Sequence, residues 1–128
     1  MKNYNKNFCF TGLAKSFKHA FRGFSVLLKN EYNLYIQLVF AGISIVAGFL
    51  FDISFVEWAI QTTSIGLVIF SELVNTAIEK TMDLVHPGYD DRVRDIKDLA
   101  ASTVLFTVGI AVASAAFIYL PKLVLVLK

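Results

Sequence analysis

The sequence predicts an all-α membrane protein, in which an N-terminal amphipathic surface helix precedes three transmembrane helices. The chain of 128 residues is 56% hydrophobic and has a mean hydropathy of +0.62, so it is more apolar than a soluble domain. Three long apolar stretches account for this excess: residues 34–51, 53–85 and 99–120. The length suits one domain, and we expect residues 1–128 to form a single integral-membrane domain.

Residues 12–30 are expected to form the surface helix. Its large apolar residues recur at spacings of four, three and four: Phe17, Phe21, Phe24 and Leu28. Lysine and arginine side chains lie between them, and a helix with one apolar and one basic face binds an anionic membrane surface. An ordinary helix packed against the bundle would show the same pattern, so this alternative stays open.

The first and third apolar stretches have the length that a bilayer requires. At 1.5 Å per residue, residues 34–51 and 99–120 form helices about 27 and 33 Å long, close to the ~30 Å hydrocarbon core of a membrane. Only a tight turn fits between residue 51 and the second stretch, so the first two helices form an antiparallel hairpin.

The second stretch, residues 53–85, is apolar through Phe70 and increasingly polar afterwards. We expect a long helix whose last turns emerge from the membrane. Pro87 and Gly88 follow directly, and this pair of residues ends a helix.

Basic residues determine the expected orientation. Six lysine and arginine residues precede the first span, and the turn after it has none. Arg92, Arg94 and Lys97 lie between the second and third spans. Because basic loops stay in the cytoplasm, we expect a multi-pass protein with a cytoplasmic N-terminus. The net charge of +2 and the lack of a basic face rich in aromatics exclude nucleic acid as a partner.

The most informative residues form a polar stripe on the second span, which we define as Glu72, Asn75, Glu79 and Asp83. Spacings of three, four and four place them within an arc of about 80° over about 16 Å of helix. A carboxylate at membrane depth costs several kcal/mol unless it is compensated, so such residues usually face a functional site. Three carboxylates on one arc also repel one another, so the stripe holds a proton or a cation.

The chemistry of the polar stripe favours a hard cation. Carboxylate and amide oxygens suit Mg²⁺ or Ca²⁺, and no Cys or His lies on the arc. Mg²⁺ typically bridges carboxylates to phosphates, which points to a nucleotide. The sequence contains no Walker A or protein-kinase motif, so a nucleotide would occupy a site of another kind.

Two alternatives stay open on these residues. Polar side chains can hold membrane helices together through hydrogen bonds, and a non-catalytic interaction subunit would use them in that way. A small ion or proton transporter would instead relay cations along intramembrane carboxylates. No acidic residue lies between Glu57 and Glu72, which disfavours a relay across the membrane.

A longer string of residues carries a family resemblance. Glu72-Leu73-Val74-Asn75-Thr76-Ala77-Ile78-Glu79 with Asp83, followed by Lys97-Asp98-Leu99-Ala100-Ala101, resembles the signature of prokaryotic membrane diacylglycerol kinases, including the related undecaprenol kinases. The resemblance covers most of the chain and includes Arg22-Gly23 and Asn30-Glu31. It implies a homotrimeric helix bundle in the bacterial inner (plasma) membrane, with active sites between subunits. It also implies transfer of the ATP γ-phosphate to a lipid hydroxyl, giving the lipid phosphate.

The resemblance implies a role for each matching residue. Glu72 resembles the catalytic base, and Ser71 and Asn75 resemble the residues that position the substrate. Glu31 and Glu79 resemble the carboxylates that bind Mg²⁺. The residues that resemble the nucleotide-binding set are Arg22, Asp83, Lys97 and Asp98.

The sequence departs from the family pattern at two positions. Gly12 and Gln37 stand where some members carry an arginine and an acidic residue. The substrate implied is undecaprenol or diacylglycerol. The string from Phe17 to Gly23 and the segment 56–59 look more like the undecaprenol branch.

Overall fold

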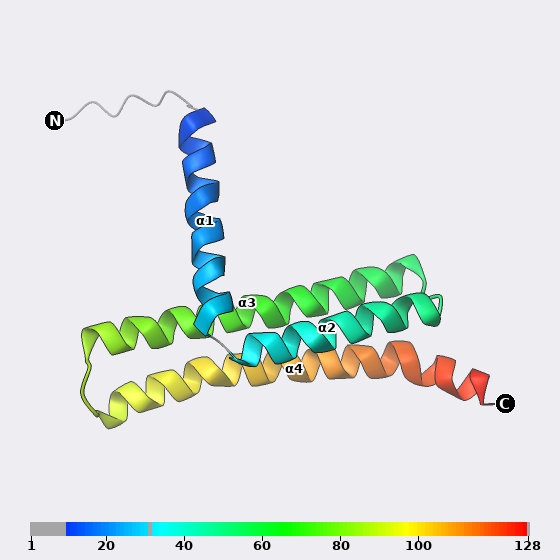
Figure 1. Cartoon of the computed structure of the whole chain (residues 1–128). Coiled ribbons are helices and arrows are strands. Elements are labelled where there is room, and N and C mark those ends of the chain that lie inside the picture. The colour runs from blue at the N-terminus through cyan, green and yellow to red at the C-terminus, as the bar shows by residue number, and fades with distance from the viewer. Residues whose placement is uncertain (1–9, 31, 128) are drawn as a thin grey trace. The chain divides into compact units, whose positions relative to one another are not determined.

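The computed structural model describes residues 10–30 and 32–127, and all regular secondary structure within them is α-helix. The elements are α1 (Phe10–Asn30), α2 (Tyr32–Leu50), α3 (Phe55–Val85) and α4 (Asp91–Val126), which Figure 1 labels in chain order. Residues 1–31 form one compact unit, and residues 32–128 form the other. The second unit contains α2, α3 and α4 and carries the polar stripe.

The first unit contains the predicted amphipathic helix, which begins at Phe10 rather than at residue 12. Its aromatic residues are exposed: Phe17 at 59%, Phe21 at 71% and Phe24 at 37%. Lys18 and Arg22 are exposed as well. The helix itself is therefore confirmed.

The turn between α2 and α3 is tight, as predicted, but α3 begins at Phe55 rather than at residue 53. Ser54 sets this start, because its hydroxyl accepts the Glu57 N–H at 3.3 Å and the Glu57 carboxylate accepts the Ser54 N–H at 2.7 Å. This reciprocal capping box satisfies free amides at the start of the helix. Asp52 has a φ of 45°, a left-handed conformation that reverses the chain.

Gly48 lets α2 approach α3 closely beside this turn. A Cβ atom at this position would lie 2.7 Å from the Trp58 ring, much closer than a normal contact. The lack of a side chain at Gly48 therefore helps to fix the register between the two helices.

Helix α4 is longer than the predicted span of 99–120. It begins at Asp91, where the Asp90 carboxylate accepts the Arg92 N–H at 2.8 Å, and continues to Val126 with Pro121 inside it. The span estimate counts only apolar residues, whereas the helix also includes the polar turns before Leu99. Its continuation past residue 120 shows that the turns after Pro121 stay helical despite the missing N–H donor.

The helices of the second unit lie side by side, with α3 antiparallel to both neighbours (Figure 1). Helices α2 and α4 are each long and apolar enough to cross a membrane. The buried residues of α3 are mostly polar: Gln61, Ser64, Ser71, Glu72, Asn75 and Thr76, together with Val68. Large apolar side chains such as Phe40, Phe106 and Phe117 are instead 67–82% exposed. This inversion of the usual soluble pattern suits a bundle surrounded by hydrocarbon.

Candidate active site

The polar stripe lies on the face of α3 that packs against the bundle, and it runs from the interior to the surface. Glu72 is 1% exposed and Asn75 is 7% exposed. Glu79 is half-buried, and the Asp83 side chain is 66% exposed. The predicted common face is confirmed, and accessibility to water rises steadily from Glu72 toward Asp83.

Glu72 is held by an amide from the neighbouring helix. The Gln37 Nε2 group of α2 donates a hydrogen bond of 2.8 Å to the Glu72 Oε2 atom. Among the described residues Glu72 forms no ion pair, so an uncharged donor supports this buried carboxylate. The carboxylate is thus held in place by one hydrogen bond on its Oε2 atom.

Three buried polar atoms close to Glu72 have no hydrogen-bond partner among the described residues. They are the Gln37 Oε1, Asn75 Oδ1 and Thr76 Oγ1 atoms. Asn75 does use its Nδ2 group, which donates to the Glu79 Oε1 atom at 3.0 Å. Leaving such groups unpaired costs roughly 1–3 kcal/mol each, so a cluster of them marks a place where a polar ligand group can bind.

Ser71 faces α4. Its hydroxyl lies 2.7 Å from the Thr107 hydroxyl and donates to the Val68 carbonyl at 2.8 Å. Both side chains are buried, and the pair joins α3 to α4 one residue away from Glu72. The role of Ser71 in positioning the substrate stays a prediction.

Lys97 and Asp83 form an ion pair between α4 and α3. Two residues of the predicted nucleotide-binding set are thus brought together at the exposed end of the polar stripe. Asp98 follows Lys97 and is exposed. Arg22 lies in α1, in the other compact unit, and Glu31 lies outside the described residues.

Of the predicted Mg²⁺ pair, Glu79 lies on α3 and Glu31 lies outside the described part. Within that part, no three Asp, Glu, His or Cys side chains are close enough to hold a metal ion. A site of the kind in which Mg²⁺ binds one or two carboxylates and completes its shell with phosphates and water needs no such cluster. The half-buried Glu79 carboxylate, with the unpaired Asn75 oxygen one turn away, has the oxygen chemistry for such a site.

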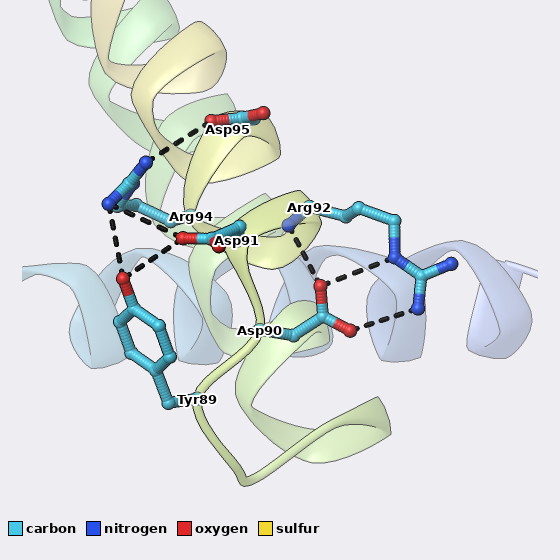
Figure 2. A network of polar contacts seen from close by, with 6 residues as sticks. All are labelled: Tyr89, Asp90, Asp91, Arg92, Arg94 and Asp95. Atoms are coloured by element: carbon cyan, nitrogen blue, oxygen red, sulfur yellow. Dashed lines mark hydrogen bonds and ion pairs between the residues drawn. The ribbon is translucent and has the colours of Figure 1, made fainter.

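The loop after α3 is tied together by charged side chains (Figure 2). As predicted, α3 ends just before Pro87 and Gly88. Arg92 donates to Asp90 from its side chain and from its backbone N–H, and these hydrogen bonds lower the pKa of Asp90 to about 2. Arg94 donates to the Tyr89 hydroxyl at 3.1 Å and pairs with Asp91 at 3.5 Å. This network fixes the start of α4 two turns before Lys97.

Sequence reasoning missed two residues of the site. It marked Gln37 only as a departure from the family pattern, although its spacing of three from the buried Leu34 puts it on the inner face of α2. Thr107 was not singled out, although it is a polar residue within an apolar span. Both contacts join residues that are 35 or 36 positions apart, so they depend on helix register, which the sequence does not reveal.

Comparisons with known proteins identify the family of this chain. The family model described as prokaryotic diacylglycerol kinase matches residues 18–119. The chain is 37% identical over 109 residues to the undecaprenol kinase of Bacillus subtilis (strain 168), covering 85% of this chain and 89% of that protein. It is 32% identical over 113 residues to the diacylglycerol kinase of Synechocystis sp., covering 87% of this chain and 64% of that protein.

The family match decides against the transporter and the non-catalytic alternatives. It also agrees with the described part of α3, where the buried polar residues between Glu57 and Glu72 are Gln61, Ser64 and Ser71, none of them acidic. The resemblance found in the sequence is confirmed over most of the chain. The protein belongs to the prokaryotic diacylglycerol kinase family of helical membrane proteins and is a lipid kinase of that family.

Proposed function

We propose that the protein transfers the ATP γ-phosphate to the hydroxyl of undecaprenol, with diacylglycerol as the second candidate acceptor. The more similar of the two relatives is an undecaprenol kinase, and the present chain spans 89% of its length. The observation that carries the reaction is the buried Glu72 carboxylate, which Gln37 holds beside unpaired polar atoms.

In this reaction Glu72 acts as the general base. The lipid oxygen forms a bond to the γ-phosphorus while its proton passes to the Glu72 carboxylate. The bond between that phosphorus and the bridging oxygen of ADP breaks, and the products are lipid phosphate and ADP. The carboxylate then releases its proton to solvent. The buried position of Glu72 supports this role, because a lipid hydroxyl reaches the reaction from the membrane side.

Asn75 and Ser71 position the acceptor next to the base. The exposed end of the polar stripe serves the nucleotide, and Glu79 with Glu31 would hold Mg²⁺. When bound, that ion neutralises negative charge on the phosphates during transfer. The proposed nucleotide contacts are Arg22, Asp83, Lys97 and Asp98. Lys97 would exchange its partner Asp83 for a phosphate oxygen, which it binds as a point charge.

The proposed assembly is a homotrimer in the bacterial inner membrane, formed from single 128-residue domains. Each subunit has three spans and a cytoplasmic N-terminus. Helix α3 also crosses the membrane, between the spans α2 and α4, because these two helices pack against it and its polar face is buried. Basic residues flank the side on which the polar stripe ends. The large exposed apolar area of α2 and α4 supports burial by lipid and by neighbouring subunits.

The experiment combines purified protein in lipid vesicles with ATP labelled at the γ-phosphate and with each acceptor in turn. We expect labelled lipid phosphate, formed faster from undecaprenol than from diacylglycerol. A chelator of divalent metals should stop the reaction, and added Mg²⁺ should restore it. Absence of labelled lipid from both acceptors would refute the proposal.

A further inference from the structure

Polar side chains join α3 to α4 at intervals along the two helices. The pairs are Glu57 with Lys122, Gln61 with Tyr119, Ser71 with Thr107, and Asp83 with Lys97. Each step along α3 is matched by a step of nearly equal length in the opposite direction along α4, so these pairs all belong to one antiparallel register. Polar contacts therefore help to fix how α3 lies against α4.

The pair of Ser71 and Thr107 is buried, unlike the ion pair at the exposed end of the polar stripe. Ser71 is 5% exposed and Thr107 is 9% exposed, whereas the Asp83 side chain is largely open. Water therefore does not compete for the hydrogen bond between the two hydroxyls, and a polar contact in such surroundings is strengthened.

The two hydroxyls have two protons for three short contacts. Their oxygens lie 2.7 Å apart, Ser71 donates to the Val68 carbonyl at 2.8 Å, and the Thr107 oxygen lies 2.9 Å from the Val104 carbonyl. Two hydroxyl oxygens at this separation need a proton between them, so Thr107 donates to Ser71. The Val104 carbonyl loses little, because it also accepts a backbone N–H within α4.

This contact reaches Glu72 through the turn of α3 that carries it. The Val68 carbonyl that accepts the Ser71 hydroxyl also accepts the backbone N–H of Glu72 within the helix. Adjacent helical residues point about 100° apart, so Ser71 faces α4 while Glu72 faces Gln37 of α2. The backbone at Glu72 is thus held from α4, and its carboxylate is held from α2.

Nucleotide binding makes this contact more important. In the proposed function Lys97 exchanges Asp83 for a phosphate oxygen, and this exchange removes the ion pair between α3 and α4 on the nucleotide side of Glu72. Among the described residues, Ser71 and Thr107 then form the polar contact between these two helices that lies nearest to the base.

We propose that Thr107 is a positioning residue for phosphate transfer. Its hydroxyl holds Ser71, and through Ser71 it keeps the Glu72 carboxylate in place while Lys97 binds the nucleotide. The inference rests on the proposed function and adds a residue of α4 to the support of the base. In this role Thr107 touches neither substrate, so its loss changes kcat and leaves the KM for ATP unaltered.

Thr107→Val tests the proposal, because it removes the hydroxyl and keeps the shape of the side chain. We expect kcat to fall about fivefold, equivalent to a hydrogen bond of about 1 kcal/mol, with the KM for ATP within about twofold of the wild type. Thr107→Ser keeps the hydroxyl and should restore kcat. Thr103→Val is the matched control, since Thr103 is exposed one turn earlier on α4 and donates to the Ala100 carbonyl of its own helix at 2.6 Å.

A double variant separates action through Ser71 from a general loss of packing. If Thr107 acts through Ser71, the variant with both Ser71→Ala and Thr107→Val should be no slower than Ser71→Ala alone. An unchanged kcat in Thr107→Val, an equal loss in Thr103→Val, failure of Thr107→Ser to restore kcat, or additive losses in the double variant would overturn the proposal.

A second measurement does not depend on phosphate transfer. A carbodiimide that dissolves in the membrane modifies protonated carboxyl groups, and mass spectrometry gives the rate of modification at Glu72, with Glu57 as the internal reference. Thr107→Val should change this rate by at least about twofold, whereas Thr107→Ser and Thr103→Val should not. An unchanged rate in an active kinase would overturn the positioning role and leave the proposed function standing. A changed rate in a protein that phosphorylates neither lipid would refute the proposed function and keep the control of Glu72 by Thr107.

Discussion

The two halves of the buried face of α3 are both polar, but they differ in how their polar groups are satisfied. In the N-terminal half, Gln61 uses both its amide nitrogen and its oxygen, and Ser64 donates to the Ile60 carbonyl. In the C-terminal half, the Asn75 and Thr76 oxygens lack partners among the described residues. Buried polar groups in native proteins are normally paired. We infer that the paired groups of the N-terminal half hold the helices together, whereas the unpaired oxygens of the C-terminal half can accept hydrogen bonds from a ligand.

The largest expected effect comes from Glu72→Gln, which removes the proton acceptor and keeps the shape of the side chain. We expect the transfer rate to fall by about 10²–10⁴-fold, with ATP binding unchanged. Steady-state kinetics with labelled ATP measure the rate, and nucleotide titration measures the binding. Glu57→Gln at the other end of α3 is the control. Retention of more than about a tenth of the rate would show that Glu72 is not the base.

The next effect concerns the exposed end of the polar stripe. Lys97→Met should raise the KM for ATP by roughly ten- to a hundredfold, since hydrogen bonds to charged groups contribute about 1.5–3 kcal/mol. Stability should change little, because partly exposed ion pairs contribute at most about 1 kcal/mol. Lys122→Met is the control. It removes a comparable ion pair, in which the Lys122 Nζ atom lies 3.2 Å from the Glu57 Oε2 atom at the opposite end of the bundle, and it should leave the KM for ATP unchanged. If both variants bind ATP as the wild type does, Lys97 is not a nucleotide contact.

A smaller effect is expected at Gln37, the residue that holds the base. Gln37→Leu removes the hydrogen bond to Glu72, and kcat should fall about tenfold while the KM for ATP stays the same. A purely structural role would instead lower the amount of folded protein without this separation of kcat from KM. Gln37→Glu cannot donate from an ionised carboxylate, so it should not restore kcat at neutral pH.

The smallest effect is expected in the loop after α3, in the network of Figure 2. The pKa of Asp90 falls from 3.8 to about 2 in the folded protein. A lowered pKa means that Asp90 stabilises the fold above about pH 4 and that this contribution disappears as the pH falls through about 2. Thermal unfolding of Asp90→Ala in detergent should therefore differ from the wild type near neutral pH and converge with it in acid. A difference that does not depend on pH would contradict the role of this carboxylate.

The sequence predicts well whatever depends on helical period. The shared face of Glu72 and Asp83 follows directly from their spacing, and Pro87 with Gly88 gives the end of α3. The start of α3 was missed by two residues because a capping box, and not hydrophobicity, sets it. The pairing of Gln37 with Glu72 was missed because it depends on the register between α2 and α3, to which the close contact of Gly48 with Trp58 contributes.

The central claim is that unpaired polar groups on α3 mark the site, whereas paired ones build the scaffold. Thermal unfolding of Thr76→Val and Gln61→Leu, measured side by side with the transfer rate of Thr76→Val, tests it most directly. Removing the unpaired buried Thr76 oxygen costs little stability, whereas removing a bonded amide costs about 1 kcal/mol or more. We predict that Thr76→Val unfolds near the wild-type temperature but loses transfer, and that Gln61→Leu unfolds at a lower temperature. Equal loss of stability in both variants, or full transfer by Thr76→Val, would contradict the account.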